Sequence, residues 1–236
     1  MHTPHLPDAV LWDMDGTIVD TEPYWMASET AVVSRHGGTW TTQQALQLVG
    51  NDLLTAAGII RAQTGIPGTD EEIVEEILAG VVARVRAEGA PWRPGALELL
   101  ARTRAAGVPC ALVTMSYQSL ADAVVAAAPA GTFGEIVTGD QVTRGKPHPE
   151  AYLTAARRLG VDITRCVAIE DSPVGVAAAV TAGARTIAVP LLVAVPAQDG
   201  LSRVRSLTDV DLDMLGRVVA GEVIDDAEPA RGALPR

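Results

Sequence analysis

An uninterrupted block of helical patterns splits an otherwise regular alternation of strand and helix patterns in this chain. Residues 9–16 have the pattern of a buried strand, and four segments with 3.6-residue periodicity follow one another between residues 21 and 91. The alternation then returns, with strand patterns at residues 108–116, 134–140, 166–171 and 185–190. Strands that alternate with helices predict a parallel sheet covered on both faces, and therefore an α/β fold.

The helical block is best explained as a domain inserted into this sheet-containing core. Its expected helices lie at residues 23–37, 41–50, 51–65 and 70–89. Pro91, Pro94 and Gly95 fit a return linker, and the segment after Asp20 fits the outgoing one. We therefore assign residues 1–20 and 92–225 to a Rossmann-like α/β core, 21–91 to an all-helical cap, and 226–236 to a flexible tail. Two linkers form a hinge, on which we expect the cap to move.

The composition is that of a globular protein and argues against several partners. Apolar residues make up 48% of the 236 residues, enough for a core. The net charge of −11 argues against nucleic acid, because binding to phosphate backbones needs a basic face. No apolar run reaches the roughly 18 residues that span a bilayer, and no signal-peptide pattern opens the chain. We expect a cytoplasmic protein without a membrane partner, as a monomer or a weak homodimer.

Lysine usage singles out one position. Lys146 is the only lysine among the 18 basic residues, and all the others are arginines. Arginine carries its charge on a planar fork, whereas lysine carries a compact point charge. Lys146 is therefore a candidate for a place that needs the point charge.

Polar residues gather where the predicted strands end. Asp13 and Asp15 follow the first strand, Thr114 follows the second, and Glu170 and Asp171 follow the fourth. Ligands of open parallel sheets bind outside the carboxyl ends of the strands, so we expect these side chains to converge there with the lone lysine. Crowded carboxylates repel each other unless a cation lies among them. The cation that suits carboxylate oxygens together with a substrate phosphate is Mg²⁺, so we expect Mg²⁺ at this place.

Four stretches, in this order, resemble the haloacid dehalogenase superfamily, in its β-phosphoglucomutase-like branch of phosphatases and phosphomutases with a helical cap. They are DMDGTIVDTE from Asp13, LVTMS around Thr114, GKPHPE around Lys146, and IEDSPVGVAAAVTAG with Glu170 and Asp171. The resemblance covers nearly the whole chain up to the tail. It implies a phosphoric monoester hydrolase with Mg²⁺ as cofactor and a small phosphorylated metabolite as substrate.

The resemblance also implies a role for each motif residue. Asp13 would be the nucleophile that forms an aspartyl-phosphate, and Asp15 the general acid and then the base that activates water. Thr114 would donate to a phosphoryl oxygen, and Lys146 would bridge Asp13 and the phosphate. The implied metal ligands are acidic: Asp13, Asp15 through its backbone carbonyl, Asp171 and, directly or through water, Glu170.

The cap supplies specificity in this superfamily. It contains no lysine here, which argues against the phosphonate-cleaving branch, and Asp15 argues against the dehalogenase branch. The sugar-phosphomutase branch usually has a His after the Tyr of its first cap helix and an Arg after the cap-loop Gly. Trp25 and residues 51–53 occupy those places here. Loss of a basic residue that would hold a second phosphate favours a phosphatase, with a phosphomutase as the alternative and a noncatalytic phosphate-binding module as a weaker one.

The substrate is expected to be a sugar or polyol phosphate. The candidate substrate-facing residues come from the first cap helix, the cap loop and the end of the second strand: Glu22, Trp25, Gly50, Asn51, Met115, Ser116 and Tyr117. Trp25 fits the cap core equally well, and Ser116 fits a structural role at the strand end.

Overall fold

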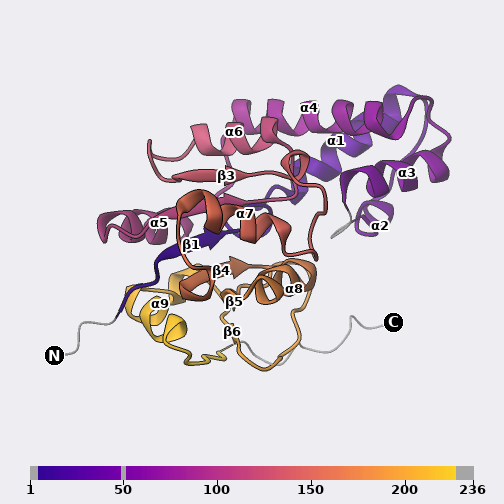
Figure 1. Cartoon of the computed structure of the whole chain (residues 1–236). Helices are drawn as coiled ribbons and strands as arrows, with labels where there is room; N and C mark the ends of the chain where they lie inside the picture. Colours follow the sequence, from indigo (N-terminus) through magenta and orange to yellow (C-terminus); the bar gives the residue numbers. More distant parts are fainter. Residues whose placement is uncertain (1–4, 49–51, 227–236) are drawn as a thin grey trace.

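The computed structural model of this chain describes residues 5–48 and 52–226, and their six strands form one sheet (Figure 1). In their order across the sheet, the strands are β3 (Glu135–Val137), β2 (Cys110–Val113), β1 (Ala9–Trp12), β4 (Cys166–Glu170), β5 (Arg185–Ala188) and β6 (Leu201–Arg203). Each neighbouring pair is parallel. The predicted α/β fold with a parallel sheet is confirmed.

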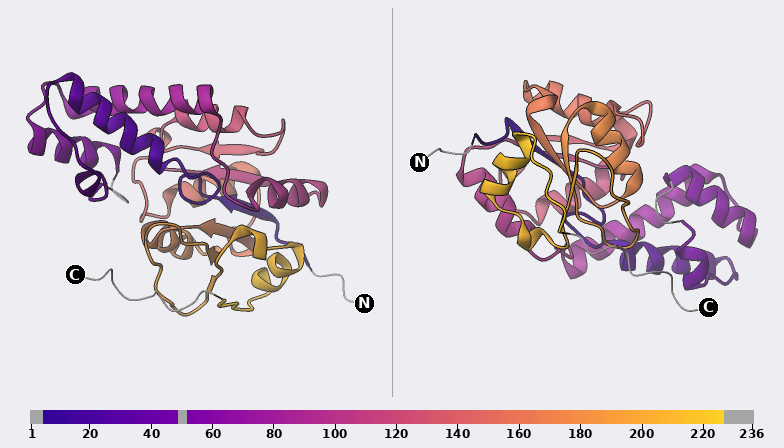
Figure 2. Two further views of the ribbon diagram at one scale, coloured as in Figure 1. Left: turned by 180° about the vertical axis from the view of Figure 1, so that it is seen from behind. Right: turned by 90° about the horizontal axis from the view of Figure 1, so that it is seen from below.

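Helices cover both faces of the sheet, as the fully buried strands β1, β2 and β4 require. Ala9 and Leu11 of β1 pack in a cluster with α7 (Glu150–Leu159) and α8 (Pro173–Ala182). Val10 and Trp12, which point to the opposite face, pack in a second cluster. That cluster includes residues of α5 (Ala96–Ala105), α6 (Gln118–Ala126) and α9 (Leu212–Val219). Figure 1 shows α7 and α8 in front of the sheet, and the view from behind in Figure 2 shows α5 and α9 on the other face.

Four helices lie between β1 and α5 in the chain, and they project beyond the sheet (Figures 1 and 2). They are α1 (Glu22–Arg35), α2 (Thr42–Ala45), α3 (Leu53–Thr64) and α4 (Asp70–Glu88), with α4 packed against both α1 and α3. A capping box of Thr69 and Glu72 starts α4, and Gly65 in the left-handed conformation ends α3. Among the helices in the described part of the chain, none has the length and apolar character needed to cross a membrane.

The helix α2 is shorter than the segment predicted at residues 41–50. A capping box of Thr41 and Gln44 starts it, as the sequence favours. The N–H groups of Gln47 and Leu48 then donate to the carbonyls of Gln44 and Ala45, three residues back, so the helix tightens into a turn.

The two linkers of the helical insertion run side by side. The N–H of Asp20 donates to the carbonyl of Pro91 at 2.9 Å, and the N–H of Arg93 donates to the carbonyl of Ile18 at 2.9 Å. Val19 and Trp92 form an antiparallel bridge between these two bonds. We propose this linker pair as the hinge of a cap that comprises residues 21–91.

The edge strand β6 was not predicted. It has three residues, two of them polar, and lacks the β-branched residues that favour a strand. The end of the described chain pairs with it: the N–H of Arg203 donates to the carbonyl of Ile224 at 2.8 Å, and Arg203 forms an ion pair with Asp225 at 2.7 Å. Apart from residue 226, the predicted tail lies outside the described residues.

Hydrogen exchange tests the hinge. If the cap closes over the core, a phosphate mimic such as beryllofluoride will change the exchange rates of the amides of Asp20 and Arg93, while buried strands such as β1 stay unchanged. The measurement is exchange followed by mass spectrometry with and without the mimic. Equal protection of both linkers in the two states would count against a moving cap.

A glycine substitution tests the packing at the start of α5. Gly95 has φ of +87°, and a Cβ there would lie 2.5 Å from the backbone nitrogen of Thr208. Gly107 has φ of +73° with nothing within 4 Å of its Cβ position. Gly107→Ala should cost about 1–2 kcal/mol of unfolding free energy for the left-handed backbone alone. Gly95→Ala should cost more, because a backbone clash adds to the strain. The measurement is urea denaturation, and an equal loss of unfolding free energy in the two variants would refute the clash at Gly95.

Candidate active site

The site lies where the strand order of the sheet reverses. The sheet continues from β1 to β2 and β3 on one side, and from β4 to β6 on the other. Trp12 of β1 is in register with Ile169 of β4, so Asp13 emerges next to Glu170 at the carboxyl edge. Ligands of open α/β sheets bind at such a switch point. The polar strand ends singled out from the sequence therefore converge at this edge.

Lys146 lies at the centre of this group. Its Nζ donates to Asp13 Oδ1 at 2.6 Å, to Glu170 Oε1 at 2.6 Å and to the carbonyl of Val113 at 2.9 Å. All three ammonium donors are thus used, and the side chain is 5% exposed. Burial alone lowers the pKa of Lys146, but the charges of Asp13 and Glu170 outweigh it and raise this pKa overall. The lone lysine is therefore a fixed positive charge between two carboxylates.

A third carboxylate, that of Asp171, lies beside the two that the ammonium binds. Ligand oxygens of Asp13, Glu170 and Asp171 all lie within 4.8 Å of one another. Burial, reinforced by the charge of Glu170 and opposed by Lys146, raises the pKa of Asp13 to about 7. Burial and the charges of Asp13 and Glu170 raise the pKa of Asp171 to about 8. A group with such an excess of negative charge favours a further cation.

The described residues fit Mg²⁺ at this place. The Oδ2 atom of Asp13 is buried and has no hydrogen-bond partner, so the protein leaves one acceptor of the carboxylate unsatisfied. Gly16 leaves room beside Asp171, because a Cβ at this glycine would lie 2.1 Å from Asp171 Oδ2. An all-oxygen donor set with carboxylates is the set that Mg²⁺ prefers.

Glu170 accepts protein donors at both of its oxygens. Oε1 accepts from Lys146 and from the hydroxyl of Tyr152, the latter at 2.7 Å. Oε2 accepts from the N–H groups of Asp171 and Ser172 at 3.1 and 3.5 Å. Of the two metal roles that the sequence leaves open for Glu170, this occupancy favours the indirect one.

Asp15 is held apart from the other carboxylates by three hydroxyls. Ser116 Oγ and Thr114 Oγ1 donate to Asp15 Oδ2 at 2.7 and 3.3 Å, and Thr21 Oγ1 donates to Oδ1. The carboxylate of Asp15 does not belong to the group of candidate metal ligands found among the described residues. Asp13 and Asp15, two residues apart, therefore occupy two different environments.

Thr21 and Arg93 were not predicted as site residues. Thr21 precedes the first residue of α1, but its hydroxyl binds Asp15 and makes no cap hydrogen bond to the helix. Arg93 donates to the carbonyls of Gly16, Val189 and Pro190 and so ties the loop after β1 to the loop after β5. Neither residue was singled out, because Thr21, although it lies in the stretch DMDGTIVDTE, fits an ordinary helix start, and Arg93 is one arginine among many.

The residues after β2 take different places. The Sδ atom of Met115 accepts from the N–H of Lys146 at 3.2 Å, so this side chain packs against the turn that carries the lysine. Ser116 orients Asp15, in line with the structural role that the sequence allowed. Tyr117 starts α6 and is partly buried. Burial and the charges of Asp140, Asp52 and Glu71 raise the pKa of Tyr117.

The candidates in the insertion are only partly described. Burial, then the charges of Glu29, Asp15 and Asp20, raise the pKa of Glu22 to about 7, so site acids as well as an acid of the insertion act on this carboxyl. Trp25 is partly buried and packs against the apolar cluster that contains residues of both the sheet face and the insertion, which favours a packing role. Gly50 and Asn51 lie outside the described residues.

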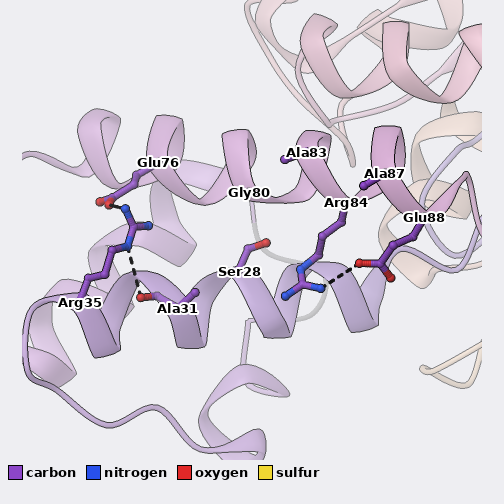
Figure 3. Close-up of a pocket in the computed structure, with 9 residues that line it drawn as sticks. All are labelled: Ser28, Ala31, Arg35, Glu76, Gly80, Ala83, Arg84, Ala87 and Glu88. Carbon is purple, nitrogen blue, oxygen red and sulfur yellow. Dashed lines mark hydrogen bonds and ion pairs between the residues drawn. The ribbon is translucent and has the colours of Figure 1, made fainter.

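A groove lies in the insertion, away from Asp13, Glu170 and Asp171. The groove has a volume of about 340 Å³ and runs between α1 and α4 (Figure 3). Its rims carry the ion pairs Arg35–Glu76 at 2.5 Å and Arg84–Glu88 at 3.1 Å, and Figure 3 shows Ser28 between the helices. None of the residues predicted for the site lines this groove.

Comparisons with a family model and with individual proteins agree on one family. The sequence model of the haloacid dehalogenase-like hydrolase family matches residues 7–183, a range that contains Asp13, Lys146 and Asp171. Hexitol phosphatase B of Escherichia coli (strain K12) is 30% identical over 227 residues, which cover 95% of this chain and 100% of that protein.

Two further relatives extend this comparison. The bifunctional riboflavin kinase/FMN phosphatase of Arabidopsis thaliana is 31% identical over 218 residues, and the match covers 89% of this chain but 56% of the plant protein. The crystal structure of CbbY from Rhodobacter sphaeroides in complex with phosphate superposes with a TM-score of 0.77 at 28% identity. That match covers 86% of this chain and 96% of CbbY.

Thermal denaturation with Mg²⁺ tests the cation site. Mg²⁺ at ten times its Kd should stabilise the wild-type protein by about 1.4 kcal/mol. Asp171→Asn should remove most of this shift, because it removes a ligand charge that faces Asp13. Asp213→Asn is the matched control, since Asp213 lies exposed in the first turn of α9. An equal Mg²⁺ shift in wild type and Asp171→Asn would exclude Asp171 as a ligand.

Proposed function

The chain belongs to the haloacid dehalogenase-like hydrolase family, and we propose that it is a Mg²⁺-dependent phosphatase of a small phosphorylated metabolite, a sugar or polyol phosphate. The observation that carries this proposal is the buried contact of Lys146 with Asp13, beside an Asp13 oxygen that has no partner. The ammonium fixes the orientation of the Asp13 carboxylate at the edge of the sheet, and an oriented, buried carboxylate of this kind suits nucleophilic attack on phosphorus.

The first step uses Asp13 and Asp15. A carboxylate oxygen of Asp13 forms a bond to phosphorus as the ester P–O bond breaks, and the protonated Asp15 gives its proton to the leaving oxygen. The product is an aspartyl-phosphate and a free alcohol. Asp15 suits this role because Thr21, Thr114 and Ser116 hold its carboxyl away from the ammonium of Lys146.

The second step returns the enzyme to its starting state. Asp15, now a carboxylate, takes a proton from water while the water oxygen attacks phosphorus, and the bond between phosphorus and Asp13 breaks. Inorganic phosphate leaves, and Asp13 is again a carboxylate. Lys146 stays charged throughout and offsets the negative charge that gathers on the phosphoryl oxygens.

Asp13 and Asp171 are the residues that would hold Mg²⁺. When bound, Mg²⁺ supplies positive charge to the phosphoryl oxygens and helps to orient the phosphate. Arg93 supports this part of the site, because it binds the carbonyl of Gly16, a residue that lies next to Asp171.

Acidic groups of the insertion support a substrate with hydroxyl groups and one phosphate. Glu22 and Glu29 are seven residues apart on α1, on the same face of the helix, and the charges of Glu29 and Asp15 both raise the pKa of Glu22. Glu29 is buried and accepts from Trp40 Nε1 at 3.0 Å, so Glu22 is the one of the two that can meet a substrate. A glutamate exchanges hydrogen bonds with hydroxyls in either protonation state and offers no positive charge to a second phosphate. This arrangement favours hydrolysis of a sugar or polyol phosphate over a mutase reaction, and the similarity to hexitol phosphatase B is in keeping with it.

Phosphate release across a panel of sugar, polyol and glycolate phosphates tests the function. Wild type should release phosphate with Mg²⁺ and not with EDTA. Asp13→Asn should abolish turnover, and Asp15→Asn should lower kcat by roughly 10²- to 10⁴-fold, the usual share of general acid–base catalysis. Turnover of Asp13→Asn at the wild-type rate would refute the mechanism. A folded wild type that releases no phosphate from any substrate would favour a mutase or a binding module.

A further inference from the structure

Tyr152 contacts both charged partners of the site, yet the mechanism above assigns it no role. Its hydroxyl donates to Glu170 Oε1 at 2.7 Å, the same oxygen that accepts from Lys146. Its ring lies beneath the ammonium, with Lys146 Nζ 5.0 Å from the ring centroid. The side chain is fully buried. One residue thus touches the lysine with its ring and the glutamate with its hydroxyl.

Small residues of α7 allow Tyr152 to reach Lys146 and Glu170. Ala151 and Ala155 are fully buried with Tyr152 on the side of α7 that packs on the sheet, in one cluster with Leu11 and Val113. Alanine at those positions brings the helix close to the strands, so the longer tyrosine reaches the carboxyl edge. The packing fixes the ring, and the hydroxyl has a single acceptor within the described structure.

Lys146 is subject to two competing carboxylates. Its distances to Asp13 Oδ1 and Glu170 Oε1 are both 2.6 Å, so the two acids attract the ammonium at equal range. Only the contact with Asp13 serves attack on phosphorus. The hydroxyl of Tyr152 is a second donor to Glu170 Oε1, so it offsets part of the negative charge of that oxygen and weakens its attraction for Lys146. The aromatic face adds an attraction that holds the ammonium in place.

We propose that Tyr152 is a positioning residue, which keeps Lys146 on Asp13 by satisfying Glu170 with its hydroxyl and by supporting the ammonium with its ring. The expected effect on kcat rests on the proposed phosphatase function. The expected position of Lys146 rests on the contacts alone. Tyr152 acts through Lys146 and Glu170 and does not itself touch the phosphate.

Removal of the hydroxyl alone gives the sharpest test. Tyr152→Phe keeps the ring but leaves Glu170 Oε1 with one donor, so Lys146 should shift toward Glu170. We expect kcat to fall roughly 10-fold, as for other supporting partners of a site, while KM stays unchanged. Tyr152→Leu, which also loses the ring, should lower kcat further. The measurement is steady-state kinetics on the best substrate of the panel, with Asp13→Asn as the blank.

Thr154→Val is the matched control. Thr154 lies on the same helix, is buried, and loses a hydroxyl that accepts from Arg157 at 3.2 Å, away from the site. If Tyr152 only stabilises α7, Tyr152→Phe and Thr154→Val will change kcat and the melting temperature alike, and the proposal is wrong. A fall in kcat in Tyr152→Phe alone, at a melting temperature equal to that of the control, supports it.

A double-mutant cycle identifies the residue through which Tyr152 acts. In the background of Glu170→Gln, Tyr152→Phe should lower kcat by much less than 10-fold, because the charge that the hydroxyl shares is already gone. If the two effects multiply, the hydroxyl does not act through Glu170 and the proposal is overturned.

A crystal structure of Tyr152→Phe tests the proposal without turnover. The contact of Lys146 Nζ with Asp13 Oδ1 should lengthen beyond hydrogen-bond distance, while the contact with Glu170 persists. An unchanged contact with Asp13 overturns the proposal even if the protein proves to be no phosphatase. Conversely, a silent wild type with a displaced lysine in the variant would refute the function and leave the positioning role intact.

Discussion

The site depends on the balance between buried carboxylates and a single ammonium. The parallel sheet brings Asp13 and Glu170 side by side at the ends of β1 and β4, and two acids at that distance repel each other in a buried place. Lys146 bridges them and uses its third donor on the backbone of β2. The geometry of the edge therefore relies on this bridge, and the other contacts refine it.

Neighbouring parts of the fold hold the other groups around this bridge in place. Three hydroxyls hold Asp15 apart, so it keeps an environment different from that of Asp13. Arg93 ties the loop after β1 to the loop after β5, and Tyr152 supports the lysine from α7. The site is thus built from elements distant in the sequence, and the sheet is the part that brings them together.

The sequence predicts the parts of the structure that follow from periodicity and from strand ends. The strands β1, β2 and β4 are buried throughout and built on apolar runs, the shorter β3 and β5 alternate with helix patterns, and the lone lysine is conspicuous among 18 basic residues. The strand β6 was missed because three residues at a sheet edge carry too weak a pattern. Arg93 was missed because its carbonyl partners lie 77 to 97 residues away along the chain, and only the folded backbone brings them into contact. Thr21 and Tyr152 were missed for another reason: Asp15 and Lys146 lie only six residues from them, but no sequence pattern shows that the intervening turns bring these side chains together.

The scarcity of lysine also gives this protein an unusual chemical surface. Lys146 is the only side-chain amine in the sequence, and its side chain is 5% exposed, with every donor engaged. An acylating reagent aimed at amines therefore finds, apart from the chain's own α-amino group, a single target that lies at the bottom of the site. Its rate of labelling would report how often the bridge between Asp13 and Glu170 opens to solvent.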